Sequence, residues 1–420
     1  MAMIAAGLAR AGLLRTLIAP FGGVAGESEW AVPAWAPAGA RRWLADELRR
    51  REMPASLTSS TIDHAASFLE AMAVGAGRIG TLRSLAPSVT RLRDSWFDRR
   101  VGQKLDRSDS GVVAVSGAAE RTLAAAGRLG IASFLECPIA HHRAAARLLR
   151  EEAQLQPEYA STMQFHDLPA SLDRRLDAEI RLADKLLVLS TYQRETFLAE
   201  GVEATKLMLV PLGVDTDFFR PEPRRDDSTF RVIFVGQITQ RKGISYLIEA
   251  FVRAAIPRSE LVLLGRVVGT NAPWRGQPNV RHINHVPRWE LPSRYNEADV
   301  YVLPSLAEGF PLTAAEAMAC GLPVIVSENT FGRDVVTDGL DGFVVPVRDS
   351  KAISDRLRYL FEDQHARSAI GAAARATAEK FSWERYGERI VSALAPRAQK
   401  SRESGELTPP TLLTEEAPRG

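Results

Sequence analysis

Short apolar runs alternate with amphipathic stretches over residues 229–346, and this pattern predicts a parallel β-sheet. The expected strands are FRVIFVG (230–236), LVLLG (261–265), ADVYVLP (298–304), LPVIVS (322–327) and GFVVPV (342–347). Strands that alternate with helices form βαβ units, whose strands run parallel. The run VIFVG is apolar on both faces, as a strand covered by helices on both sides requires.

The first half of the chain is richer in helical patterns, but it also predicts α/β structure. Its best strands are GVVAVSG (111–117), IASFLEC (131–137) and KLLVLS (185–190). The stretch AAERTLAAAGRLG (118–130) predicts a helix, which Gly130 is suited to end. At the start of the chain, we expect a helix over 2–14 that runs into a short strand over 15–19.

Three further segments complete the expected organisation. Residues 211–228 combine three prolines with a charge run and predict a linker. Residues 381–395 predict a last amphipathic helix, and the polar, proline-bearing stretch 396–420 predicts a disordered tail. The expected domains are therefore Rossmann-like units over 1–210 and 229–380.

Composition narrows the class of protein without naming a function. A chain of 420 residues favours two domains over one core. Its 53 basic and 51 acidic residues give a net charge of +2, which disfavours a dedicated nucleic-acid binder. Its two cysteines exclude a disulfide framework and a cysteine-built zinc site. The sequence has no long apolar run and no clear secretory signal, so we expect a cytoplasmic protein.

The segment PSLAEGFPLTAAEAMACGLPVIVS (304–327) carries the strongest chemical signal. A strand ends near Pro304, a loop carries Glu308, and Pro311 is suited to the first turn of a helix that Gly321 ends. Glu308 and Glu316 then bracket a helix N-terminus, where free N–H groups and the helix dipole favour an anion such as a diphosphate. Carboxylates also suit vicinal hydroxyls, because each oxygen accepts a charge-assisted hydrogen bond.

A second signal is FVGQITQRKG (234–243), in which a strand ends at Gly236. Arg241 and Lys242 follow, just before Gly243 and the helical stretch ISYLIEAF (244–251). Basic side chains at the carboxyl end of a parallel strand suit phosphate binding.

Together these segments resemble retaining glycosyltransferases of family 4, also called group 1, which use nucleotide-sugar donors. The resemblance covers about residues 111–394 and includes VPLGVDTDFF (210–219) and the FSW helix near the end. It implies a GT-B fold, in which two Rossmann-like domains face a central cleft and the C-terminal helix crosses back to the first domain. It also implies that 1–210 holds the acceptor and 229–380 the donor.

The resemblance also implies roles for individual residues. Glu308 would contact donor-sugar hydroxyls, Glu316 the ribose, and Lys242 the diphosphate. The usual Arg directly after VG is Gln237 here, so one diphosphate charge is missing or Arg241 supplies it. We expect the donor site to comprise these residues together with Gly236, Phe310, Pro311, Leu312 and Thr313.

The first half contributes a histidine candidate in FLECPIAHHRAAARLLREEAQ (134–154). Here a strand, a loop with His141 and His142, and a helix starting near Arg143 follow one another. Related sequences have a His in the corresponding loop, facing the donor sugar. An imidazole there could bind the sugar or help the acceptor proton to leave. We favour His141 as a catalytic residue and place His142 and Arg143 on the acceptor or sugar side, and His142 stays open as the cleft-facing residue.

The N-terminus departs from the family pattern, because the usual first strand and Gly-rich loop do not precede the helix expected over 2–14. We therefore expect the first domain to lack them, and FGG (21–23) offers glycines only after that helix.

The leading hypothesis is a retaining, metal-independent glycosyltransferase that moves a sugar from a nucleotide-diphosphate donor to a glycan, lipid-linked or small-molecule acceptor. No metal or other cofactor is expected, because protein cations and a helix dipole serve the diphosphate. Arginine clusters with tryptophans in the first domain suggest peripheral contact with the inner membrane face. The alternatives are a non-catalytic nucleotide-sugar-binding relative and a GT-B hydrolase or epimerase.

Overall fold

The computed structural model describes residues 86–109, 111–163, 167–223, 228–269, 273–390 and 392, together with the backbone of four short strands nearer the start. Those strands pair in parallel, β1 with β4 and β2 with β3. Their bounds are β1 Leu17–Ala19, β2 Gly23–Val24, β3 Glu52–Met53 and β4 Ser60–Ile62. The strand expected over 15–19 is therefore confirmed as β1. The helix expected over 2–14 and the tail expected over 396–420 lie outside the described residues.

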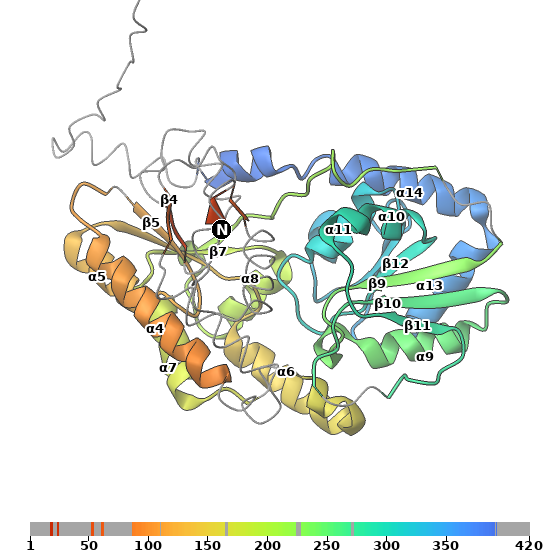
Figure 1. Cartoon of the computed structure of the whole chain (residues 1–420), viewed down its shortest axis with the longest axis horizontal. Helices are drawn as coiled ribbons and strands as arrows, with labels where there is room; N and C mark the ends of the chain where they lie inside the picture. The colour runs from red at the N-terminus through yellow and green to blue at the C-terminus, as the bar shows by residue number, and fades with distance from the viewer. Residues whose placement is uncertain are drawn as a thin grey trace, which may run out of the picture.

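The second half forms a six-stranded, fully parallel sheet in the order β11-β10-β9-β12-β13-β14 (Figure 1). Its strands are β9 Phe230–Val235, β10 Ser259–Leu264, β11 Val280–Ile283, β12 Val300–Leu303, β13 Val324–Ser327 and β14 Phe343–Val345. The five strands expected here are confirmed. The sixth, β11, was not predicted, because its sequence VRHI is half polar and it lies at the sheet edge, where one side is open.

Helices cover both faces of this sheet, as its apolar strands require. In chain order they are α9 Ile244–Ala254, α10 Leu291–Asn296, α11 Leu312–Ala319, α12 Gly332–Val335, α13 Ser350–Glu362 and α14 Gln364–Ala378. Helix α9 packs with α13, and α11 packs with α14. Strands β9 and β12, which precede the two candidate motifs, are neighbours in the middle of the sheet.

The first half forms a four-stranded parallel sheet in the order β5-β6-β7-β8. Its strands are β5 Gly111–Val115, β6 Ala132–Glu136, β7 Lys185–Val188 and β8 Leu207–Leu209, so the three strands expected here are confirmed. The helices are α4 Ala86–Lys104, α5 Glu120–Leu129, α6 His142–Leu155, α7 Ala170–Leu182 and α8 Thr191–Ala199.

The last helical segment, residues 383–390, returns to the first domain (Figure 1). Its Tyr386 and Ile390 are buried in one apolar cluster with Phe134 of β6 and Leu187 of β7. The expected crossover is therefore confirmed. Among the residues that the structure describes, no helix combines the length and the apolar character needed to cross a membrane.

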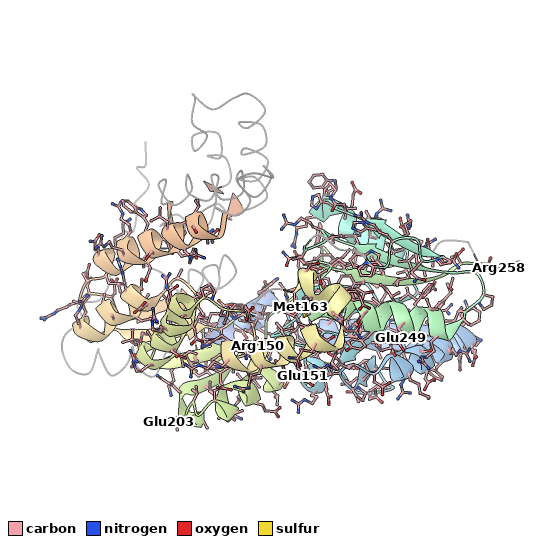
Figure 2. The ribbon with its side chains drawn as sticks, turned by 90° about the horizontal axis from the view of Figure 1, so that it is seen from below. Arg150, Glu151, Met163, Glu203, Glu249 and Arg258 are labelled. Atoms are coloured by element: carbon pink, nitrogen blue, oxygen red, sulfur yellow. The ribbon has the colours of Figure 1, made fainter. Side chains whose placement is uncertain are left out.

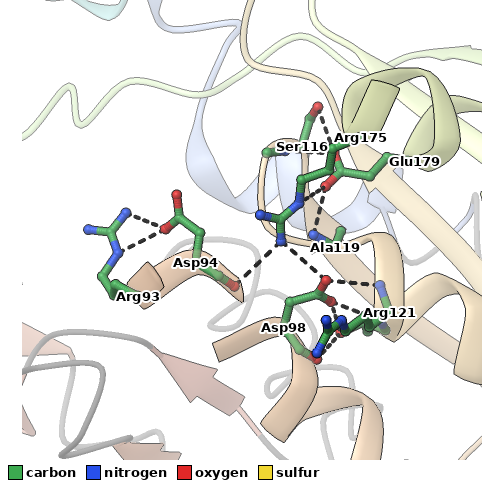
Figure 3. Close-up of polar contacts among 10 residues, drawn as sticks. Arg93, Asp94, Asp98, Ser116, Ala119, Arg121, Arg175 and Glu179 are labelled. Carbon is green, nitrogen blue, oxygen red and sulfur yellow. Dashed lines mark hydrogen bonds and ion pairs between the residues drawn. The ribbon is translucent and has the colours of Figure 1, made fainter. Parts of the chain in front are cut away.

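A buried charge cluster fixes the loop between β5 and α5 (Figure 3). The residue that caps α5, Ala119, has no polar side chain. Instead Asp98 of α4 accepts hydrogen bonds from two amides in the first turn of α5, at 2.8 and 2.9 Å. Glu179 of α7 accepts from two amides of the loop, at 2.7 and 2.8 Å. Arg175 lies between these two carboxylates, 3.2 Å from Asp98 and 3.5 Å from Glu179, and its single positive charge offsets part of theirs.

One segment of the first half packs on the second domain. Leu149 of α6, and Tyr159 and Met163 just beyond it, belong to the same buried apolar cluster as the second sheet. Tyr159 stacks on Trp274, with ring centroids 6.2 Å apart. Figure 2 shows α6 and Met163 extending from the first domain towards the second. Helix α6 therefore belongs to both domains.

Candidate active site

The loops that follow β9 and β12 lie side by side because these strands are neighbours. The backbone oxygen of Arg241 accepts from the Leu306 amide at 2.8 Å and from the Ser305 hydroxyl at 3.0 Å. Gly243 has φ 73°, and a Cβ at this position would lie 2.0 Å from the Pro304 oxygen. Only glycine permits this approach. The two motifs, 60 residues apart in sequence, thus form one site.

Arg241 and Lys242 converge on Glu308 at the centre of this site. Arg241 and Lys242 both pair with Oε1 of Glu308. Arg241 also donates to the backbone oxygen of Ala307 at 2.7 Å. Glu308 is only 8% exposed, so water screens these contacts weakly.

Burial and the neighbouring charges shift the pKa values of Glu308 and Lys242 in opposite directions. Burial favours a higher pKa for Glu308, but Lys242 and Arg241 outweigh it and the net pKa is lowered. Burial lowers the pKa of Lys242, although Glu308 opposes that shift. Glu308 is therefore a carboxylate at neutral pH, and the three side chains together carry a net charge of about +1 when Lys242 is protonated.

Helix α11 begins directly after this cluster. Its cap residue, Pro311, supplies no side-chain hydrogen bond to the first turn. Phe310 stacks on Phe331, with ring centroids 4.8 Å apart, and this contact anchors the loop. Leu312 and Thr313 are partly exposed in the first turn. Their backbone N–H groups lie at the positive end of the helix dipole, which suits an anion.

Glu316 lies on the same helix and is 9% exposed. Its Oε2 accepts a hydrogen bond from the Tyr295 hydroxyl at 2.9 Å. Burial raises the pKa of Glu316 to about 7, against the opposing effects of Tyr295 and Arg288. This carboxyl group therefore changes charge near neutral pH.

The first domain faces this site through the loops after β6 and β7. A Cβ on Gly309 would lie 2.4 Å from the Pro138 oxygen, so the loop that carries Glu308 touches the loop after β6. Ala307 is buried in one cluster with Tyr192 of α8. Asp334 of α12 accepts from the Thr191 amide at 2.8 Å. Both domains thus border the candidate site.

The structure places the predicted histidines on the first-domain side. His141 caps α6, with Nδ1 accepting from the Arg143 amide at 3.3 Å, and its ring packs against Phe197. Burial, reinforced by the charge of His142, lowers the pKa of His141 to about 4. His141 is therefore a neutral imidazole at pH 7. Among the described residues, neither histidine forms a hydrogen bond or an ion pair with Glu308 or Lys242, so the catalytic role of His141 stays a prediction.

His142 and Arg143 pair with α7. Nε2 of His142 lies 3.2 Å from both Asp173 and Asp177, and Arg143 also pairs with Asp177. Burial lowers the pKa of His142, and the two aspartates oppose this.

Ligand atoms of His141, His142 and Asp177 lie within 4.8 Å of one another, as a metal site requires. However, the two imidazole rings stack at 4.4 Å with an interplanar angle of 25°. Lone pairs in nearly parallel rings do not converge on one ion, and Arg143 already neutralises Asp177. The arrangement therefore fits an ion-pair network better than a metal centre.

The other residues predicted for the donor site lie just after β9 and in the first turn of α11. Gly236 ends β9 with φ 145°, and Gln237 is exposed beside it. The Thr313 hydroxyl lies 2.7 Å from that of Tyr301. Sequence reasoning did not find Tyr295, the partner of Glu316. Its place in the short helix α10 gives it the pattern of an ordinary core residue.

Comparisons with known proteins identify relatives of the domain that carries this site. The family model "Glycosyl transferases group 1" matches residues 215–377. A D-inositol 3-phosphate glycosyltransferase of Xylanimonas cellulosilytica is 30% identical over 263 residues, which cover 56% of this chain and 62% of the relative. A GDP-mannose-dependent alpha-(1-6)-phosphatidylinositol monomannoside mannosyltransferase of Mycolicibacterium smegmatis is 29% identical, over 52% of this chain and 63% of the relative. The chain thus spans less than two thirds of the length of these relatives.

Solved structures match across both domains. HepE from Anabaena, in complex with UDP and glucose, superposes with a TM-score of 0.58 at 16% identity and covers 91% of this chain and 99% of its own. Sucrose-phosphate synthase from Thermosynechococcus elongatus gives 0.56 at 21% identity, over 74% of this chain and 79% of its own. These matches confirm the predicted GT-B fold. Residues 215–377, which hold Lys242, Glu308 and Glu316, therefore form a domain of the glycosyl transferases group 1 family.

Proposed function

We propose that the chain is a retaining glycosyltransferase that takes a sugar from a nucleotide-diphosphate donor. The observation that carries this proposal is the convergence of Arg241 and Lys242 on Glu308, directly before the N-terminus of α11. Two cations and open helix amides offer binding partners to a diphosphate, while carboxylates offer acceptors to hydroxyl groups.

The donor would lie along α11, and its ribose, its diphosphate and its sugar would each contact different side chains. Glu316 would accept hydrogen bonds from the ribose, Lys242 and Arg241 would hold the diphosphate, and Glu308 would contact the sugar. HepE was solved with UDP and glucose, and the Mycolicibacterium relative is GDP-mannose-dependent. Both descriptions fit a nucleotide-diphosphate sugar as the donor class.

In the reaction, the bond between the anomeric carbon and the diphosphate oxygen breaks as the acceptor oxygen bonds to that carbon, and the proton of the acceptor hydroxyl passes to the departing diphosphate oxygen. The transition state resembles an oxocarbenium ion, and negative charge grows on the leaving diphosphate. Lys242, Arg241 and the first amides of α11 are fixed in place before the reaction and would stabilise this charge. These protein groups make the transfer metal-independent in our proposal.

We propose that His141 donates a hydrogen bond to the sugar and does not act as a strong base. Its Nδ1 accepts from a backbone amide, so the neutral ring carries its proton on Nε2. An Nε2–H group donates a hydrogen bond, which suits a sugar hydroxyl at the cleft. The acceptor, whether a glycan, a lipid-linked carrier or a small molecule, would enter from the first domain.

The first prediction concerns Lys242. We expect Lys242→Ala to lower turnover of the donor by about 100-fold, because it removes a cation that stabilises the leaving diphosphate. The affinity for the nucleoside monophosphate should change little, since most of the charge that Lys242 serves is on the distal phosphate. A mass-spectrometric screen of UDP- and GDP-sugars with the purified chain, run with and without EDTA, identifies the donor and measures turnover. NMR of the product tests anomeric retention.

Lys351→Ala is the matched control, because Lys351 is exposed and pairs only with Asp355 on its own helix in the described structure. Equal losses of monophosphate and diphosphate affinity in Lys242→Ala would indicate folding damage instead. Tight donor binding without any turnover by the wild type would favour the non-catalytic relative.

The second prediction concerns pH. Because the pKa of Glu316 is raised to about 7, the ribose-binding carboxylate forms as pH rises through neutrality. We expect the affinity for the intact nucleotide sugar to increase between pH 6 and pH 8. In Glu316→Gln this dependence should vanish, and the affinity at pH 8 should fall about tenfold through weaker hydrogen bonds.

Calorimetry with the intact donor measures this cleanly, because its diphosphate lacks the terminal group that titrates near pH 6. If Glu316→Gln keeps both the wild-type affinity and the wild-type dependence of affinity on pH, Glu316 does not bind the ribose.

We further propose peripheral contact with an anionic membrane, through α4. Leu92 and Trp96 lie one turn apart on this helix and are 58% and 42% exposed. Arg91 and Arg99 are exposed beside them. Exposed arginines beside an exposed tryptophan suit electrostatic contact with an anionic surface.

The third prediction follows from this surface. The chain should co-sediment with anionic vesicles at low salt and dissociate as salt rises, because the attraction is screened. Trp96→Ser should weaken binding, and neutral phosphatidylcholine vesicles serve as the control. Failure to co-sediment with anionic vesicles at low salt would favour a soluble acceptor.

A further inference from the structure

Glu152 is a fully buried carboxylate whose described hydrogen-bond partners all come from the other domain. It lies on α6 and is 0% exposed. Its Oε1 accepts from Nε2 of Gln240 at 2.6 Å. Its Oε2 accepts from Nε of Arg348 at 2.8 Å and from the Tyr246 hydroxyl at 3.2 Å. A buried charge is costly unless it is paired and hydrogen-bonded, so these contacts tie α6 firmly to the second domain.

Gln240 is the residue directly before Arg241 and Lys242, and it is held from two sides. Its side chain bonds to Glu152, and its backbone N–H donates to the Thr162 hydroxyl at 2.9 Å. Both Glu152 and Thr162 belong to the segment that leaves the first domain. Residues 240–242 form a single 3-10 turn, so a displacement of Gln240 moves both cations.

Arg348 reinforces the same connection. Its φ of 66° lies in the left-handed region, which non-glycine residues rarely adopt. Its guanidinium pairs with Glu152 and, at 2.9 Å, with the neighbouring Glu151. Glu151 has no described contact with Gln240, and its side chain is 58% exposed.

We infer that Glu152 is a positioning residue that holds the cation-bearing turn 240–242 in its diphosphate-binding geometry. It acts from α6, whose other end carries the histidines of the first domain, so the arrangement of the two domains is coupled to the donor site. This inference rests on the proposed function, because it assigns the turn to the diphosphate. Glu152 touches no part of the donor in this account and acts through Gln240.

The first readout is independent of any ligand. All three partners of Glu152 are donors, whereas the Gln side chain of Glu152→Gln has one acceptor oxygen and no charge. It therefore cannot accept from Gln240 and from Arg348 and Tyr246 at once, and the link between α6 and the turn weakens. Hydrogen–deuterium exchange of the full chain should then show faster exchange in a peptide spanning residues 238–247. Glu151→Gln, the matched control, should leave that peptide unchanged. Unchanged exchange in Glu152→Gln would overturn the inference.

The second readout is nucleotide affinity, measured by calorimetry with UDP or GDP, whichever the wild type binds, and with the corresponding monophosphate. Glu152→Gln should weaken diphosphate binding roughly tenfold and monophosphate binding less than about twofold, since Glu316 is untouched. Equal losses for both ligands would show a merely structural role and overturn the inference. If the wild type binds no nucleotide, the proposed function fails, and the exchange measurement still decides whether Glu152 holds the turn.

Thr162→Val provides a second test if Glu152→Gln does not fold. It removes the acceptor for the Gln240 amide while keeping nearly the same side-chain shape. It should change exchange and diphosphate affinity in the same direction by a smaller factor. No change in either quantity would contradict the account.

Discussion

Two basic side chains, Arg241 and Lys242, meet one carboxylate, Glu308, where little water remains to separate them. Without Glu308, the two cations would repel each other and lose hydration with no compensation. With it, the site keeps a net positive charge beside the open end of α11. The three side chains can approach one another because Gly243 lets the loops after β9 and β12 come into contact.

Contacts between the domains surround this cluster. The loop that carries Glu308 lies against the loop after β6, and Asp334 binds the first amide of α8. In addition, Glu152 of α6 accepts a hydrogen bond from Gln240, the residue directly before the two cations. The cations are therefore held by groups from both halves of the chain. A GT-B protein arranged in this way can couple the position of its domains to the geometry of its donor site.

The sequence predicted most of the sheet and the donor motifs, but not the contacts between them. Buried parallel strands are apolar on both faces, so β9 and β12 were readily identified, whereas the half-polar edge strand β11 was missed. Proline and glycine set the ends of α11 closely. The pairing of Glu308 with Arg241 joins residues 67 apart, and Glu152 shares α6 with several other charged residues. Such long-range pairs depend on strand order and helix docking, which no local pattern encodes.

The most direct test of this account is to compare diphosphate affinity and donor turnover in Glu308→Gln. The account holds that Glu308 shares its cations with the diphosphate and also serves the sugar. Gln keeps an oxygen that can accept from Arg241 and Lys242, but it removes the negative charge that competes with the diphosphate. Calorimetry should therefore show diphosphate affinity unchanged or higher, while turnover falls by about 100-fold. A parallel loss of affinity and turnover, or an unchanged turnover, would contradict the central role of Glu308.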